Sequence, residues 1–160
     1  MRIAATFFTF LMLAGTGVLP AQLASKKSMT LEAAKQIAGA AEAEARKNKW
    51  NVVIAIVDDG ANLVYLQKMD ETQIGSIEVA QEKARTAVKF KRASKVFEDA
   101  VKNGRQVVLK LPGALPIEGG LPLMMDGKVI GAIGVSGVQS NEDGIIAEAG
   151  VAAFSRMGAR

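Results

Sequence analysis

The stretch Pro112–Gly137 constrains the fold of this 160-residue chain more than any other segment. Asp126-Gly127 separates two apolar runs, Leu121–Met125 and Val129–Val135, and Asp-Gly between such runs indicates a two-residue β-hairpin turn. Glycine recurs in and just after the second run, at Gly131, Gly134 and Gly137. Because glycine weakens the interior of a strand, this repetition predicts that another backbone or a ligand approaches the strand closely.

Apolar periodicity predicts the other elements. Thr30 is a good N-cap for a first helix, and the continuous apolar run Trp50–Val57 predicts a strand that is covered on both faces. After a turn at 58–60, Asn62–Lys68 is expected to return as its antiparallel partner. The remaining predictions are helices over 74–90 and 94–102, a short strand over 106–111, and a final helix capped by Asn141 and ending at Phe154.

The predicted order is helix, hairpin, two helices, hairpin, helix. Hairpins joined by helical excursions form an antiparallel sheet with helices packed on it, so the expected class is α+β. A chain of 160 residues is long enough for one domain with a substantial core, and no internal repeat divides it.

The first 24 residues have the pattern of a secretory signal peptide. Arg2 is followed by the uncharged run Ile3–Leu19 and by small residues that allow cleavage after Ala21 or Ala24. The alternative is a transmembrane anchor, but about 17 apolar residues are few for a membrane span. We therefore expect a signal peptide over 1–24, a single domain over 25–160, a periplasmic or secreted location, and no stable membrane anchor after cleavage.

Cysteine and histidine are both absent from the chain. Without cysteine there are no disulfides, so an exported domain depends on its core and on oligomerisation. Without histidine, Ser-His-Asp hydrolysis is excluded, as are the commonest zinc ligand and the usual proximal haem ligand. The net charge of +4 is compatible with an anionic ligand, and no motif indicates a nucleic-acid partner.

Three residues of the second predicted helix could grip a planar anionic ligand such as haem. Lys83, Thr86 and Phe90 lie at positions i, i+3 and i+7, so a cation, a hydroxyl and an aromatic ring share one helix face. The structural alternative places Phe90 in the core, bonds Thr86 back to its own helix, and leaves Lys83 solvated.

The loop Glu118-Gly119-Gly120 is the second candidate site. Successive glycines allow backbone amides to point at a bound group, while Glu118 could bind a cation or act as a base. The alternative is that the glycines only permit the turn into the following strand.

Other charged residues carry weaker signals. Arg85, Lys89 and Arg92 form a basic stripe that is either a solvated face or a holder of ligand carboxylates. Asp143 is expected to complement the dipole of the last helix. Pairs of carboxylates on the helices supply too few ligands for a hard-metal site, so the sequence predicts no metal centre.

Methionine and tyrosine are the remaining candidates for an axial haem ligand in a chain without histidine. Met124 and Met125 alternate across their predicted strand, so one is expected to face inward and the other outward. Tyr65 lies within a predicted strand, where cross-strand packing competes with iron ligation.

Four stretches together resemble the GlcG/HbpS-like family of haem-binding or haem-degrading proteins. They are EKARTAVKFKRAS (Glu82–Ser94), EGGLPLMMDG (Glu118–Gly127), IGAIGVSG (Ile130–Gly137) and NEDGIIAEAGVAAF (Asn141–Phe154). The resemblance covers Met29–Phe154. It implies a profilin-like or PAS-like antiparallel sheet of about five strands, haem binding or degradation, assembly into oligomers and, in some members, partner sensor proteins.

Three functional hypotheses follow. The first is an exported, homo-oligomeric protein that binds haem or a similar small planar or anionic ligand. Its glycine-lined strands and alanine-rich helices are the faces expected to be buried between subunits. The second is an enzyme that acts on a small organic acid or ring compound, with Glu118 or Lys83 as acid or base. The third is an accessory oligomer without a ligand.

Overall fold

The computed structural model describes residues 22–23 and 26–158. The predicted signal peptide therefore lies almost entirely outside the described residues. The elements follow the predicted order. They are α1 (Leu31–Lys47), β1 (Val53–Asp58), β2 (Leu63–Lys68), α2 (Ser76–Phe90), α3 (Lys95–Lys102), the 3₁₀ helix η1 (Gln106–Lys110), β3 (Gly120–Met125), β4 (Lys128–Ser136) and α4 (Ser140–Met157).

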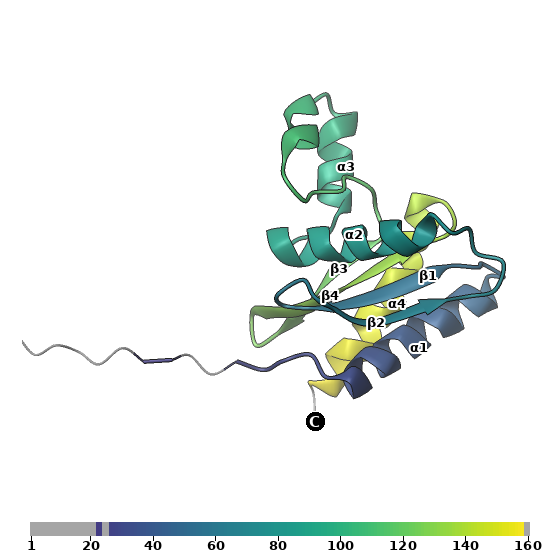
Figure 1. The fold of residues 1–160 in the computed structure, drawn as a ribbon, viewed down its shortest axis with the longest axis vertical. Helices are drawn as coiled ribbons and strands as arrows, with labels where there is room; N and C mark the ends of the chain where they lie inside the picture. The colour runs from purple at the N-terminus through teal and green to yellow at the C-terminus, as the bar shows by residue number, and fades with distance from the viewer. Residues whose placement is uncertain (1–21, 24–25, 159–160) are drawn as a thin grey trace, which may run out of the picture.

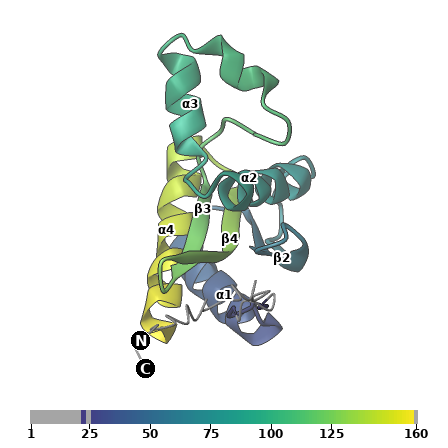
Figure 2. The same cartoon turned by 90° about the vertical axis from the view of Figure 1, so that its left-hand side faces the viewer.

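A four-stranded antiparallel sheet in the order β2-β1-β4-β3 forms the centre of the molecule. Helix α2 covers one face, and α1 and α4 pack together on the other (Figure 1, Figure 2). The α+β class is confirmed, with four described strands in place of the expected five or so. Among the described helices, none is long and apolar enough to cross a bilayer.

The central strand β1 is buried on both faces, as its continuous apolar run predicted. Ile54 and Ile56 join the core formed with α1 and α4, whereas Val53 and Val57 face the alanines of α2. Successive side chains of a strand point to opposite faces, so a strand between two helical layers must be apolar throughout.

The predicted hairpin turn at Asp126-Gly127 is confirmed. Strand β3 ends at Met125 and β4 begins at Lys128, which leaves these two residues as the loop. Their φ angles of 51° and 72° are both positive, as a type I′ turn requires.

The glycines of the hairpin mark close approaches of the backbone. A Cβ atom on Gly134 would lie 2.0 Å from the carbonyl oxygen of Ala80, and one on Gly120 would lie 2.1 Å from that of Lys83. Both carbonyls belong to α2, so these glycines let the helix backbone rest directly on β3 and β4. Of the two predicted causes, another backbone or a ligand, the structure shows the backbone.

The short strand predicted over residues 106–111 is wrong, because this segment is the helix η1. It belongs to an excursion with α3 that stands away from the sheet, so no described strand lies beside it to complete a ladder (Figure 1). Local bonds satisfy its backbone instead, with Val108 N–H donating to Arg105 O and Leu111 N–H to Val108 O.

The predicted boundaries of the last helix are also corrected. Gln139, not Asn141, is its N-cap, and a reciprocal capping box joins Gln139 to Glu142. The helix continues past Phe154 to Met157.

Candidate functional site

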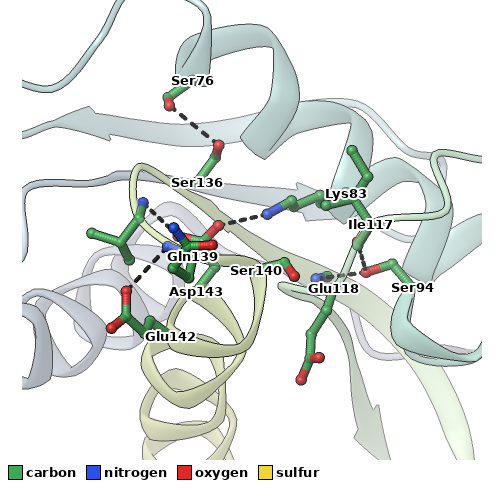
Figure 3. Close-up of polar contacts among 12 residues, drawn as sticks. Ser76, Lys83, Ser94, Ile117, Glu118, Ser136, Gln139, Ser140, Glu142 and Asp143 are labelled. Carbon is green, nitrogen blue, oxygen red and sulfur yellow. Dashed lines mark hydrogen bonds and ion pairs between the residues drawn. The ribbon is translucent and has the colours of Figure 1, made fainter. Parts of the chain in front are cut away.

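A buried ion pair joins helices on opposite faces of the sheet. Lys83 Nζ on α2 lies 2.7 Å from Asp143 Oδ2 in the first turn of α4 (Figure 3). The two side chains are only 1% and 3% exposed. The alternative of a solvated Lys83 is therefore wrong. The start of α4 does place Asp143 where a carboxylate suits the helix dipole, but its partner Lys83, 60 residues away, was not foreseen.

Burial dominates the electrostatics of the pair. It raises the pKa of the Asp143 carboxyl, and the Lys83 ammonium and the Val138 N–H only partly offset this effect. The Val138 N–H donates to Asp143 Oδ1 at 3.3 Å. Lys83 donates to one carboxylate oxygen, and no second acceptor for its ammonium is found within the described residues.

The glycines of the predicted loop lie directly beside this pair. A Cβ atom on Gly119 would be 2.9 Å from Lys83 Nζ and 2.7 Å from Val135 O, and Gly119 has a φ of +121°. Gly120 rests on the Lys83 carbonyl. The structure therefore brings Lys83, Gly119 and Gly120 together, although the sequence predicted them as two separate candidate sites. The contact leaves no space for a side chain.

Two hydroxyls hold this loop against the helices. Ser94 Oγ donates to Ile117 O at 2.6 Å and accepts from Gly120 N at 2.9 Å (Figure 3). Thr86 Oγ1 accepts from Leu115 N at 2.8 Å instead of bonding within its own helix. Sequence reasoning missed the role of Ser94, because a serine near a helix start is already explained as a cap.

Glu118 is tied into a charged cluster on the outer side of the loop. Its Oε2 lies 2.9 Å from Lys95 Nζ, and its N–H donates to Glu98 Oε2 at 2.5 Å. Burial opposes ionisation of Glu98. The bond from Lys102 and the Glu118 N–H more than offset this, so the pKa of Glu98 is lowered.

Phe90 is the one predicted residue that lies apart from the others. Seven residues separate it from Lys83, which is about 10 Å along the helix axis. Its ring is 5.0 Å from that of Phe97 in an edge-on arrangement, and Arg92 lies over Phe97 at 5.9 Å. Phe90 therefore belongs to the contact between α2 and α3.

Two hollows flank the tip of the β3–β4 hairpin, and none of the predicted site residues lines either of them. The first, of about 310 Å³, is lined by Lys26, Lys27, Met125, Asp126, Lys128, Val129 and Ile130. The second, of about 280 Å³, also includes Met125 and Asp126 and extends to Phe154. A third hollow, of about 510 Å³, lies between the start of α1 and the end of α4.

The methionines at the hairpin divide as predicted. Met124 is 47% exposed and lines only the second hollow, whereas Met125 is half-buried against the core and lines both hairpin hollows. Tyr65 is half-buried in β2, and its hydroxyl donates to Gln67 Oε1 at 3.2 Å. The combination of a thioether and lysines at one hollow was not predicted, because Lys26 and Lys27 lie about 100 residues before the hairpin in the chain.

Fold and site define an α+β protein in which a buried lysine–carboxylate pair joins the two helical layers across one sheet. The chain belongs to the HbpS-like family: the family model described as haem-degrading protein HbpS-like matches residues 29–152. The family resemblance inferred from the motifs is confirmed.

Individual relatives agree with this assignment. The chain is 41% identical to protein GlcG of Escherichia coli over 112 residues, or 70% of this chain and 84% of that protein. A solved double mutant of Streptomyces reticuli HbpS has 30% identity and a TM-score of 0.75, covering 84% of this chain and 94% of that one. A solved PduOC–haem complex has 29% identity and a TM-score of 0.72, covering 79% and 95%.

Proposed function

We propose that this protein is an exported, homo-oligomeric binding protein whose ligand is haem or a similar planar anion. The observation that carries the proposal is the likeness to a PduOC–haem complex over most of the chain. The likeness to HbpS and the match to a haem-degrading family support the same ligand class.

The lysine-lined hollow at the hairpin has the chemistry that such a ligand needs. In a chain without histidine or cysteine, a methionine thioether is a soft ligand for haem iron. Met125 offers that thioether, Val129 and Ile130 offer apolar surface, and Lys128 offers a cation for a propionate, whereas Lys26 and Lys27 already pair with Asp59 and Asp126. Lys128 forms no ion pair with any described residue. We therefore assign Met125 and Lys128 as the principal ligand contacts.

The Lys83 cluster is a second candidate site, as the sequence predicted. It is favoured by the buried ammonium, which has three donors and a single acceptor among the described residues. A ligand carboxylate could satisfy the free donors only if the loop over residues 112–119 opens, because the closed loop leaves no room. An enzymatic role for Lys83 or Glu118 depends on the same opening.

Export and self-association complete the proposal. Export is supported by the composition of residues 1–24. Self-association is supported by the outer edge of β2, which pairs with no other described strand. The alanine face of α1 is already buried in the core of its own subunit, so it is not the expected interface.

Haem titration of the mature protein, followed by absorbance and native mass spectrometry, tests the proposal. We expect saturable binding, a Soret band that shifts in Met125→Leu, and weaker binding in Lys128→Gln. Met124→Leu is the matched control and should behave as wild type. Loss of binding in a Lys83→Ala variant that circular dichroism shows to be folded, with Met125→Leu still binding, would move the site to the loop cluster. Non-saturable uptake would refute a specific haem function and favour an accessory oligomer without a ligand.

A further inference from the structure

Residues 91–117 leave the end of α2 and return at the start of β3, and we call them the arm. The arm contains α3 and η1, which pack against each other. Figure 1 and Figure 2 show α3 and η1 standing away from the sheet and from the body of α2. Phe97 and Val108 are its buried large apolar side chains. Most of its surface is therefore available to a partner.

The net charge of the arm equals the net charge of the whole chain. The arm contains six basic and two acidic residues, a net charge of +4, which equals the net charge of all 160 residues. The rest of the chain therefore sums to zero. All six cations are exposed; they are Lys91, Arg92, Lys95, Lys102, Arg105 and Lys110. Lys91, Arg92, Arg105 and Lys110 form no ion pair with any described residue.

Exposed aliphatic side chains lie among these cations. Val107 and Leu109 are 64% and 54% exposed, and Val96, Leu111 and Ile117 are also exposed. Val107 and Leu109 flank the inward-facing Val108 in η1, so two aliphatic groups project on either side of the residue that anchors the helix. The described part of the same subunit leaves both of them open to solvent.

We infer that the arm docks on the surface of a bilayer that contains anionic phospholipid. Basic residues mixed with exposed aliphatic ones are typical of segments that lie at the headgroup boundary, where phosphates meet the cations and acyl chains take up the apolar groups. Because the arm projects, it reaches the bilayer surface before the rest of the protein does. Its cations then lie within a Debye length of that surface. This attachment is peripheral and does not depend on the proposed ligand site.

Other partners fit the arm less well. A second copy would bring two arms of +4 charge together, and lysine is depleted in the cores of protein interfaces. Single-stranded nucleic acid is bound by exposed aromatic rings, whereas Phe90 and Phe97 pack edge-on against each other.

Co-sedimentation with vesicles tests the inference on the mature full-length chain. We expect binding to phosphatidylcholine vesicles that contain phosphatidylglycerol, little binding to pure phosphatidylcholine, and loss of binding at high salt. Each cation near the surface contributes about fivefold to the partition coefficient, so Arg105→Gln with Lys110→Gln should lower it about 25-fold. Val107→Ser with Leu109→Ser should lower it at least tenfold, because both aliphatic contacts are lost.

Matched control variants test whether the loss of vesicle binding is specific to the arm. Lys35→Gln with Lys49→Gln removes two exposed lysines outside the arm, and Ile74→Ser with Ile145→Ser removes two exposed isoleucines outside it. Both should bind as wild type, and circular dichroism should confirm that every variant is folded. Three results would overturn the inference: equal loss in the controls, no vesicle binding, or arm variants that change only the oligomeric state in light scattering.

Discussion

The burial of the pair Lys83–Asp143 predicts a large loss of stability when either partner is replaced. Lys83→Met and Asp143→Asn each remove one partner and leave the other without its counter-charge in a nearly dry site. Breaking a buried pair in this way costs about 3–5 kcal/mol. The whole domain is expected to have only about 5–15 kcal/mol of unfolding free energy. Each single variant should therefore lose from about a fifth of that free energy to all of it.

The double variant separates pairing from simple burial. Lys83→Met with Asp143→Asn leaves no buried charge at the site, and the new amide oxygen can still accept from the Val138 N–H as Asp143 Oδ1 does. We expect the double variant to lose no more than the worse single variant. The corresponding coupling energy is at least about 3 kcal/mol, at the top of the range measured for residues in contact. Urea unfolding at equilibrium measures the wild type, the two single variants and the double variant. Equal slopes of the unfolding free energy against urea concentration check that all four unfold in two states.

The pH dependence of Lys83→Met supplies a second readout. Burial already raises the pKa of Asp143, and removing the ammonium removes the main opposing effect. A carboxyl whose pKa is raised in the folded state favours folding at acid pH and loses that contribution as pH rises through the folded value. The loss of unfolding free energy caused by Lys83→Met should therefore increase from acid to neutral pH. Single variants that each cost less than about 1 kcal/mol with no coupling would refute the reasoning.

Three further predictions concern other parts of the chain. Gly134→Ala should lower the free energy of unfolding by at least about 3 kcal/mol, because the new Cβ would lie 2.0 Å from Ala80 O. Gly39→Ala should raise it by about 0.5–1 kcal/mol, because the new Cβ at this exposed helix position meets nothing within 4 Å. Thermal unfolding measures both variants. The lowered pKa of Glu98 gives stability that is present above its ordinary pKa and is lost on acidification, so Glu98→Gln should flatten the acid side of the stability–pH curve. N-terminal sequencing of the exported protein should begin within residues 22–26, and an intact first methionine would contradict cleavage.

Local patterns were sufficient to predict most of the fold. The hairpin at Asp126-Gly127 follows from two residues that tolerate positive φ between apolar runs. The buried strand β1 follows from an unbroken apolar run, and α1 from its cap at Thr30. The segment 106–111 shows where this reasoning fails. Its composition suits a strand, but a strand also needs a neighbour, and only the path of the arm decides whether one is present.

The site was predictable only in part, for a related reason. The helix face of Lys83 and the glycine loop could be identified separately, since each has a local pattern. That they meet, and that Asp143 completes the pair, depends on how α2 and α4 are placed on opposite faces of the sheet. The same holds for Met125 and the lysines beside it.

The sequence by itself determined the elements, their order, the antiparallel hairpins and the exclusion of histidine and cysteine chemistry, because these depend on neighbouring residues or on composition. The tertiary structure alone decided that Lys83 is buried, that the hairpin glycines serve backbone packing, and that the arm projects with the net charge of the chain. These properties depend on contacts between residues tens of positions apart. Such contacts leave no periodic signal along the chain, because their partners are chosen by the packing of whole helices and strands.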